Sequence, residues 1–243
     1  MLNYTKFFLI FLFFFSFSSS LKAQNFNLKI IEIRKEINRD DIKKALKLLG
    51  EIKVASDIQQ EKVDLLFGDI YLKINKPEKA IEFYEKAFMT SDSETESLSE
   101  LGLSEANLRK GNLSKAVYHA KRSVELDEDN LRNKIVLAIS LTRNGEKDEA
   151  LQILENLYIN NKNNSEIVLA IAGYHSTFEN NKKALEILDK FLKRFPTSIR
   201  IMDELGNLYW IEGNKEKALE LKSKVFFSLF FKLTTKLSFS LLK

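Results

Sequence analysis

Residues 145–154 read GEKDEALQIL and residues 180–188 read NNKKALEIL, so two successive segments of the chain carry the same pattern. Their alanines, Ala150 and Ala184, lie 34 residues apart. Alanines in a similar context recur with spacings of 35, 36, 34, 34 and 34 residues, at Ala45, Ala80, Ala116, Ala150, Ala184 and Ala218. A period this regular is typical of repeat proteins, in which each unit is one supersecondary structure stacked on the next.

Each alanine begins an apolar stripe with helical spacing. After Ala150 the apolar residues fall at i+1, i+4, i+7 and i+8, namely Leu151, Leu154, Leu157 and Tyr158. This spacing gives a wide apolar face on one helix. Residues that accept the left-handed conformation at a helix end stand shortly before the stripes, at Asn75, Gly111, Gly145 and Gly213. The sequence therefore predicts two helices per repeat, separated by a tight turn.

When each signature alanine is given position 20, the units begin at Phe26, Glu61, Ser97, Leu131, Ser165 and Ile199. Position 8 is then small in five of the six units, at Gly68, Ser104, Ala138, Ala172 and Gly206. This pattern resembles the tetratricopeptide repeat family, in which positions 8 and 20 are small because the paired helices cross there. The resemblance implies an all-α fold, a right-handed α-solenoid of helix-turn-helix repeats over residues 61–221. Ile33 occupies position 8 of the first unit, so residues 24–60 are expected to be a degenerate or capping repeat.

The N-terminus has the three parts of a secretory signal peptide. Lys6 is followed by an apolar run from Phe7 to Phe15, then by a serine-rich stretch and Ala23. The run is too short to cross a bilayer, which needs about 20 apolar residues. We expect residues 1–23 to be a signal peptide and the protein to be exported to the periplasm or cell envelope; the alternative is an uncleaved anchor.

Composition argues against an enzyme and against a nucleic-acid binder. Without residues 1–23 the formal charge falls from +4 to +2, and no basic stripe stands out. The chain has no cysteine, and its two histidines, His119 and His175, lack a second ligand at metal spacing. No phosphate-binding glycine loop or paired-histidine zinc helix occurs. We expect no catalytic residue, no cofactor and no metal.

The resemblance implies a partner-binding groove lined by the first helix of each repeat. Carried over to this sequence, the groove residues are Leu65, Leu101, Ile135 and Leu169 at position 5, Lys73, Arg109 and Arg143 at position 13, and Asp69, Glu105, Arg132, Asn207 and Trp210. An apolar stripe beside a row of cations would suit an extended or helical peptide with some negative charge. The expected function is a protein-interaction scaffold.

Each row also has a purely structural explanation. The apolar residues at position 5 could pack one repeat against the next. The cations at position 13 could complement the dipole at the end of a helix, worth about 0.3 to 1 kcal/mol each.

The C-terminal tail, residues 222–243, departs from the repeat pattern. Residues 1–23 and 225–243 together hold 12 of the 19 phenylalanines of the chain. Three interpretations of the tail stay open: a capping helix on which Leu221, Val225, Leu229 and Leu233 share a face, a segment that contacts a partner or a membrane, and an aberrant end. The second gives an alternative function, a membrane-associated envelope assembly factor.

Overall fold

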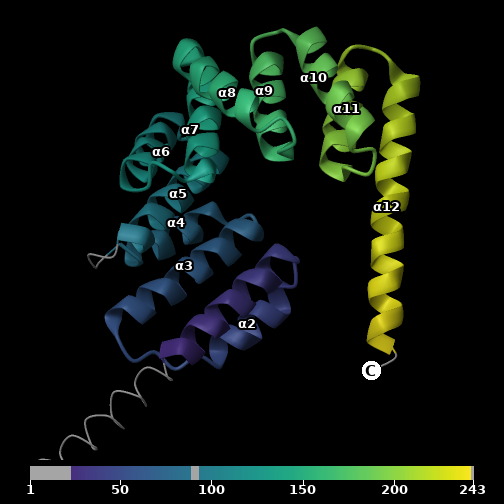
Figure 1. Ribbon diagram of the computed structural model, residues 1–243. Coiled ribbons are helices and arrows are strands. Elements are labelled where there is room, and N and C mark those ends of the chain that lie inside the picture. The colour runs from purple at the N-terminus through teal and green to yellow at the C-terminus, as the bar shows by residue number, and fades with distance from the viewer. Residues whose placement is uncertain (1–22, 89–92, 242–243) are drawn as a thin grey trace, which may run out of the picture. The chain divides into compact units, whose positions relative to one another are not determined.

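The computed structural model describes residues 23–88 and 93–241, with side chains as far as Phe231 and at Thr234. The described residues form helices and no strand (Figure 1). Except for Ala23, the predicted signal peptide lies outside the described residues. None of the described helices combines the length and the apolar content that crossing a membrane requires.

The chain divides into two compact units, Met1–Glu128 and Asp129–Lys243. In the first unit, residues 23–38 are helical and are followed by α2 (Ile42–Gly50), α3 (Asp57–Lys73), α4 (Pro77–Lys86), α5 (Ser93–Lys110) and α6 (Leu113–Leu126). The second unit contains α7 (Leu131–Asn144), α8 (Lys147–Asn160), α9 (Ser165–Thr177), α10 (Asn181–Arg194), α11 (Ile199–Ile211) and α12 (Lys215–Leu241).

Within each unit the helices pack as successive pairs. In the first unit α3 packs on α4 and α5 on α6, and α5 also contacts both helices of the pair before it. In the second unit the pairs are α7 with α8, α9 with α10 and α11 with α12, and α9 contacts both α7 and α11. The expected fold class, an all-α solenoid of helix-turn-helix repeats, is confirmed.

The small residues lie where the sequence predicts them, at the crossings of paired helices. All six signature alanines are at most 1% exposed. The residues at position 8 are buried as well, from Gly68 in α3 to Gly206 in α11. In the first unit Ile33 is fully buried in a cluster with Ile30, Ala45 and Leu66, so a larger residue fits this crossing.

Every turn between paired helices contains one residue with positive φ. These residues stand five positions before the signature alanines, at Asp40, Asn75, Gly111, Gly145, Glu179 and Gly213. The four positions that the sequence indicated are confirmed. Asp40 and Glu179 also adopt this conformation, which aspartate accepts more readily than glutamate. Asparagine caps then begin helices of the second unit: Asn164, for example, accepts from the backbone N–H of Glu166 at 2.9 Å.

The last helix, α12, is continuous from the final repeat into the C-terminal tail. Its signature alanine Ala218 and the residues Leu221 and Val225 are buried in the core of the second unit. Leu229, which the sequence placed on the same face, is half exposed. The capping interpretation thus describes α12 as far as Val225, and the structure differs from it at Leu229.

Candidate partner-binding surface

The first helices of the repeats carry the predicted groove residues: α3 and α5 in the first unit, and α7, α9 and α11 in the second. Each of these helices is held between its own partner helix and the neighbouring pair. Apolar side chains that face both neighbours are therefore buried, and side chains at the ends of these helices reach solvent.

The four apolar residues at position 5 take part in the packing of repeat on repeat. Leu65, Leu101 and Ile135 are only 2%, 7% and 4% exposed. Leu65 belongs to a cluster with Tyr84 of α4 and Leu103 of α5, and Leu169 is partly buried against the core of the second unit. The structure favours the packing explanation for this row, and direct contact of these residues with a partner stays a prediction.

In the first unit, two of the predicted groove residues support neighbouring elements. Asp69 accepts a hydrogen bond of 2.9 Å from the hydroxyl of Tyr84, and burial raises the pKa of this hydroxyl well above its ordinary value. Arg109 donates from Nη1 to the backbone carbonyl of Leu72, in the last turn of α3. The same carbonyl accepts from the backbone N–H of Asn75 at 3.1 Å, so Arg109 adds a second hydrogen bond at this helix end and has a structural role.

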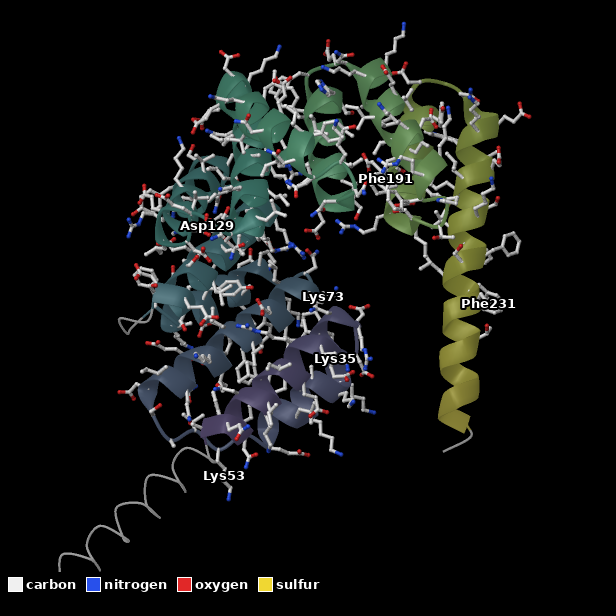
Figure 2. All side chains as sticks on the ribbon, viewed as in Figure 1. Lys35, Lys53, Lys73, Asp129, Phe191 and Phe231 are labelled. Carbon is white, nitrogen blue, oxygen red and sulfur yellow. The ribbon has the colours of Figure 1, made fainter. Side chains whose placement is uncertain are left out.

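Lys73 and Glu105 complete the predicted set of the first unit. Lys73 ends α3, is exposed (Figure 2), and its Nζ lies 3.9 Å from Oδ1 of Asp40 in a solvent-exposed ion pair. Such pairs contribute little to stability. Glu105, in α5, is half-buried. Because the ion pair of Lys73 with Asp40 contributes little, Lys73 could bind a ligand with a small loss of stability.

In the second unit, Arg132 belongs to a row of charges at position 2 of three successive repeats. Its Nη1 lies 3.5 Å from Oε1 of Glu166, and Nη1 of Arg200 lies 3.4 Å from the same oxygen. The row of Arg132, Glu166 and Arg200 follows the 34-residue period, so the repeat register could have revealed it. Both arginines are exposed and lie close to the same carboxylate of Glu166.

Asn207, Trp210 and Arg143 are the other predicted residues of the second unit, and all three are exposed. Oδ1 of Asn207 accepts from Nζ of Lys222 at 2.6 Å. The Trp210 ring is 54% exposed, with Nζ of Lys215 5.7 Å from its centroid. Arg143 makes no hydrogen bond or ion pair with a residue that the structure describes. An exposed tryptophan and an exposed arginine are typical anchors of a protein interface.

One exposed apolar residue beside this set was not predicted. Ile211 follows Trp210 at the end of α11 and is also largely exposed. Ile211 occupies position 13, which holds lysine or arginine in three earlier repeats, so the cationic pattern did not predict an apolar residue there. Trp210 and Ile211 together form an apolar patch at the end of α11.

The histidines have packing or hydrogen-bonding roles. Nδ1 of His119 lies 2.6 Å from Oε2 of the buried Glu100, and burial lowers the pKa of His175. In the part of the chain that the structure describes, no group of His, Asp and Glu side chains could hold a metal ion.

Comparison with known proteins gives the same kind of repeat. The family profile described as Tetratricopeptide repeat matches residues 65–91. A curated relative, the antiviral innate immune response effector IFIT1 of Macaca fascicularis, is 30% identical over 89 residues. That match covers 37% of this chain and 19% of the relative, so the chain spans only a small part of that protein.

Two solved structures match over most of the chain. TTC0263, a thermophilic tetratricopeptide repeat protein of Thermus thermophilus, matches with a TM-score of 0.60 and 19% identity, covering 75% of this chain and all of that one. A tetratricopeptide repeat protein from Parabacteroides merdae matches with a TM-score of 0.66 and 16% identity, covering 83% and 77% of the two chains. The helix pairs described above are thus folded as in tetratricopeptide repeat proteins.

Proposed function

We propose that the protein is a non-enzymatic scaffold that docks a peptide or an extended segment of a partner protein on the first helices of its repeats. The observation that carries the proposal is the exposed set of Arg143, Asn207 and Trp210 on first helices of the second unit. Because these side chains are exposed, packing within the repeats does not explain why they are present.

The chemistry of this set indicates the kind of peptide. Arg143 offers a cation for a carboxylate, and Trp210 with Ile211 offers an apolar patch for one anchoring side chain. Asn207, which already accepts from Lys222, would orient the peptide backbone. A short acidic peptide with one large apolar residue fits best, with an affinity in the micromolar range, about −8 kcal/mol.

The proposed place of action is the periplasm or the cell envelope. This part of the proposal rests on the sequence of residues 1–23, with its cation, short apolar run and Ala23. Determining the N-terminal residue of the protein in the envelope fraction would test this part. A chain that has lost residues 1–23 would support export, and a chain that keeps Met1 in the cytoplasm would contradict it.

The binding proposal is tested with the exposed residues, because aspartate at the buried Leu101 or Ile135 would disrupt the core and prevent any interpretation of lost binding. Partners captured from an envelope extract are identified by mass spectrometry, and a peptide from the captured partner is then titrated by calorimetry. We expect Arg143→Glu and Trp210→Ala each to weaken binding by about 2 kcal/mol, or roughly thirty-fold.

Matched control variants make comparable changes on second helices, a charge reversal and the loss of an aromatic ring. Lys190→Glu reverses an exposed charge on α10, and Tyr118→Ala removes an exposed aromatic ring from α6. Neither change should alter the peptide affinity. If Arg143→Glu and Trp210→Ala bind the peptide as tightly as the two controls do, the first helices of the second unit are not the docking surface.

A further inference from the structure

The second half of α12 exposes an aromatic surface that no neighbouring repeat covers. Five apolar side chains between positions 226 and 231 are between 52% and 70% exposed, namely Phe226, Phe227, Leu229, Phe230 and Phe231. Phe231 is labelled in Figure 2 on the part of α12 that runs beyond α11. A monomeric protein rarely exposes so many large apolar side chains together.

The geometry of the helix turns this surface away from the core. Successive residues of an α-helix are rotated by about 100°, so Phe226, Phe227, Phe230 and Phe231 fall within an arc of about 140°, whereas Leu229 lies nearer to Val225. Leu221 and Val225, which are buried against the second unit, lie on the other side of the helix. Because the four rings lie opposite the packed face, the packing of α12 on the second unit leaves them exposed.

The turn before α11 leaves the edge of this surface open. Thr197 and Ile199 line a hollow of about 680 Å³ together with Phe227, Phe230 and Phe231. The aromatic surface therefore has an exposed face and an open flank within the second unit.

Charge identifies the kind of surface that fits. Glu220 is the last acidic residue of the chain, and lysines follow at positions 222, 224, 232, 236 and 243. Lys222 pairs with Asp203 at 2.6 Å and Lys224 with Glu220 at 2.5 Å. The three later lysines have no acidic residue near them in the sequence. A second copy of the chain would bring the same positive charges together, whereas an anionic lipid surface would complement them.

We propose that the second half of α12 lies on an anionic membrane surface, with the Phe226–Phe231 face in the boundary between headgroups and acyl chains. By helical rotation positions 232 and 236 fall on the side opposite the four phenylalanines. A helix with aromatic residues on one side and lysines on the other binds at this depth. This contact is separate from the peptide surface of the first helices, so either proposal can fail while the other holds.

The absence of cysteine allows a local test in the full chain. Leu229→Cys, labelled with an environment-sensitive fluorophore, reports from the exposed 226–231 stretch beside the aromatic rings, and Ile159→Cys on α8, 63% exposed, reports on general adsorption. Each labelled protein is titrated with phosphatidylcholine vesicles, with and without phosphatidylglycerol. We expect a blue shift at position 229 with the anionic vesicles, and no shift at position 159 or with the neutral vesicles.

Two double variants in the Leu229→Cys background separate the apolar and the charged contributions. Phe230→Ser with Phe231→Ser removes exposed rings and should weaken vesicle binding at least tenfold while circular dichroism stays unchanged. Lys232→Gln with Lys236→Gln should weaken it about thirty-fold, at about 1 kcal/mol per lysine, and should reduce its dependence on salt.

Three results would overturn the lipid proposal. The first is a label at position 229 that does not respond to anionic vesicles, and the second is an equal response to neutral ones. The third is a blue shift that grows with protein concentration in the absence of vesicles, which would assign the aromatic face to a second copy of the chain. Trp210→Ala should leave the vesicle titration unchanged, because Trp210 belongs to the peptide surface.

Discussion

A single added methyl group at Gly102 should loosen the first unit. The ring of Tyr84, on α4, is 1% exposed and fills the space between α3 and α5. Gly68 on α3 and Gly102 on α5 both face this ring. A Cβ atom at Gly102 would lie 2.4 Å from Cζ and 2.5 Å from Cε1 of Tyr84, and one at Gly68 would lie 2.5 Å from Cε1. Carbon atoms do not approach this closely, so α5 or the ring must move.

The structure limits how the clash can be relieved. The hydroxyl of Tyr84 donates to Asp69 at 2.9 Å, so a shift of the ring would strain a partly buried hydrogen bond. Overpacking a core costs about 1 to 3 kcal/mol. Alanine in place of glycine inside a helix contributes about 0.5 to 1 kcal/mol in the opposite direction. We expect Gly102→Ala to lower the free energy of unfolding by about 1 to 2 kcal/mol.

Gly173 provides the control for the same chemical change. It lies inside α9, and a Cβ atom built there meets no heavy atom within 4 Å. Gly173→Ala should therefore raise the free energy of unfolding by about 0.5 to 1 kcal/mol. Urea denaturation followed by circular dichroism measures both variants, and the two effects should have opposite signs.

A double-mutant cycle tests whether the ring is the cause. Tyr84→Ala removes the atoms that Gly102→Ala would contact, so the cost of Gly102→Ala should disappear in that background. If Gly102→Ala is as stable as the unaltered protein, or if it remains destabilising without the Tyr84 ring, the contact between Gly102 and Tyr84 does not limit packing here.

Three further predictions concern the second unit. Ala150→Leu should lower the free energy of unfolding by about 1 to 3 kcal/mol, measured by urea denaturation, because Ala150 is fully buried at a helix crossing. Gly145→Ala should lower the free energy of unfolding by about 1 kcal/mol in the same assay, because the backbone φ of 86° disfavours alanine although the added Cβ meets no atom within 4 Å. Glu179→Gly, at a φ of 60°, should not lower it, because glycine accepts positive φ. Burial and then the hydrogen bond to Asp189 raise the pKa of Tyr209 to about 12, so spectroscopic titration of the unaltered protein and of Tyr209→Phe should differ by one late-titrating tyrosine. The contribution of Tyr209 to stability is complete below about pH 10 and is lost as the pH rises towards 12.

The repeat period predicted the backbone better than the individual residues did. Asn75, Gly111 and Gly145 were identified as turn residues because their side chains tolerate positive φ. Asp40 and Glu179 were not identified as turn residues, although they stand at the same distance before their alanines. In a stacked repeat the position of the crossing fixes the turn, so the register outweighs the local preference of one residue.

Contacts between repeats were harder to predict than the repeats themselves. Gly102 lies outside the expected crossing position, and its need to be small comes from Tyr84 on the preceding pair. Likewise, the break on α12 between the buried Val225 and the exposed Leu229 depends on where α11 begins at Ile199. One sequence carries the period of each helix, but it does not give the three-dimensional neighbours that decide which face stays covered.

The same limit explains why the apolar row at position 5 was ambiguous and why Trp210 is more informative. Stacking requires apolar residues at position 5 whether or not a ligand binds, and Leu65 and Ile135 are accordingly buried. Position 12, by contrast, varies from repeat to repeat, as Leu72, Leu108, Thr142, Ser176 and Trp210. A buried leucine or threonine there has a packing role, but the exposed ring of Trp210 contributes little to its own repeat. A large aromatic side chain that the fold does not need is the strongest indication of where a partner binds.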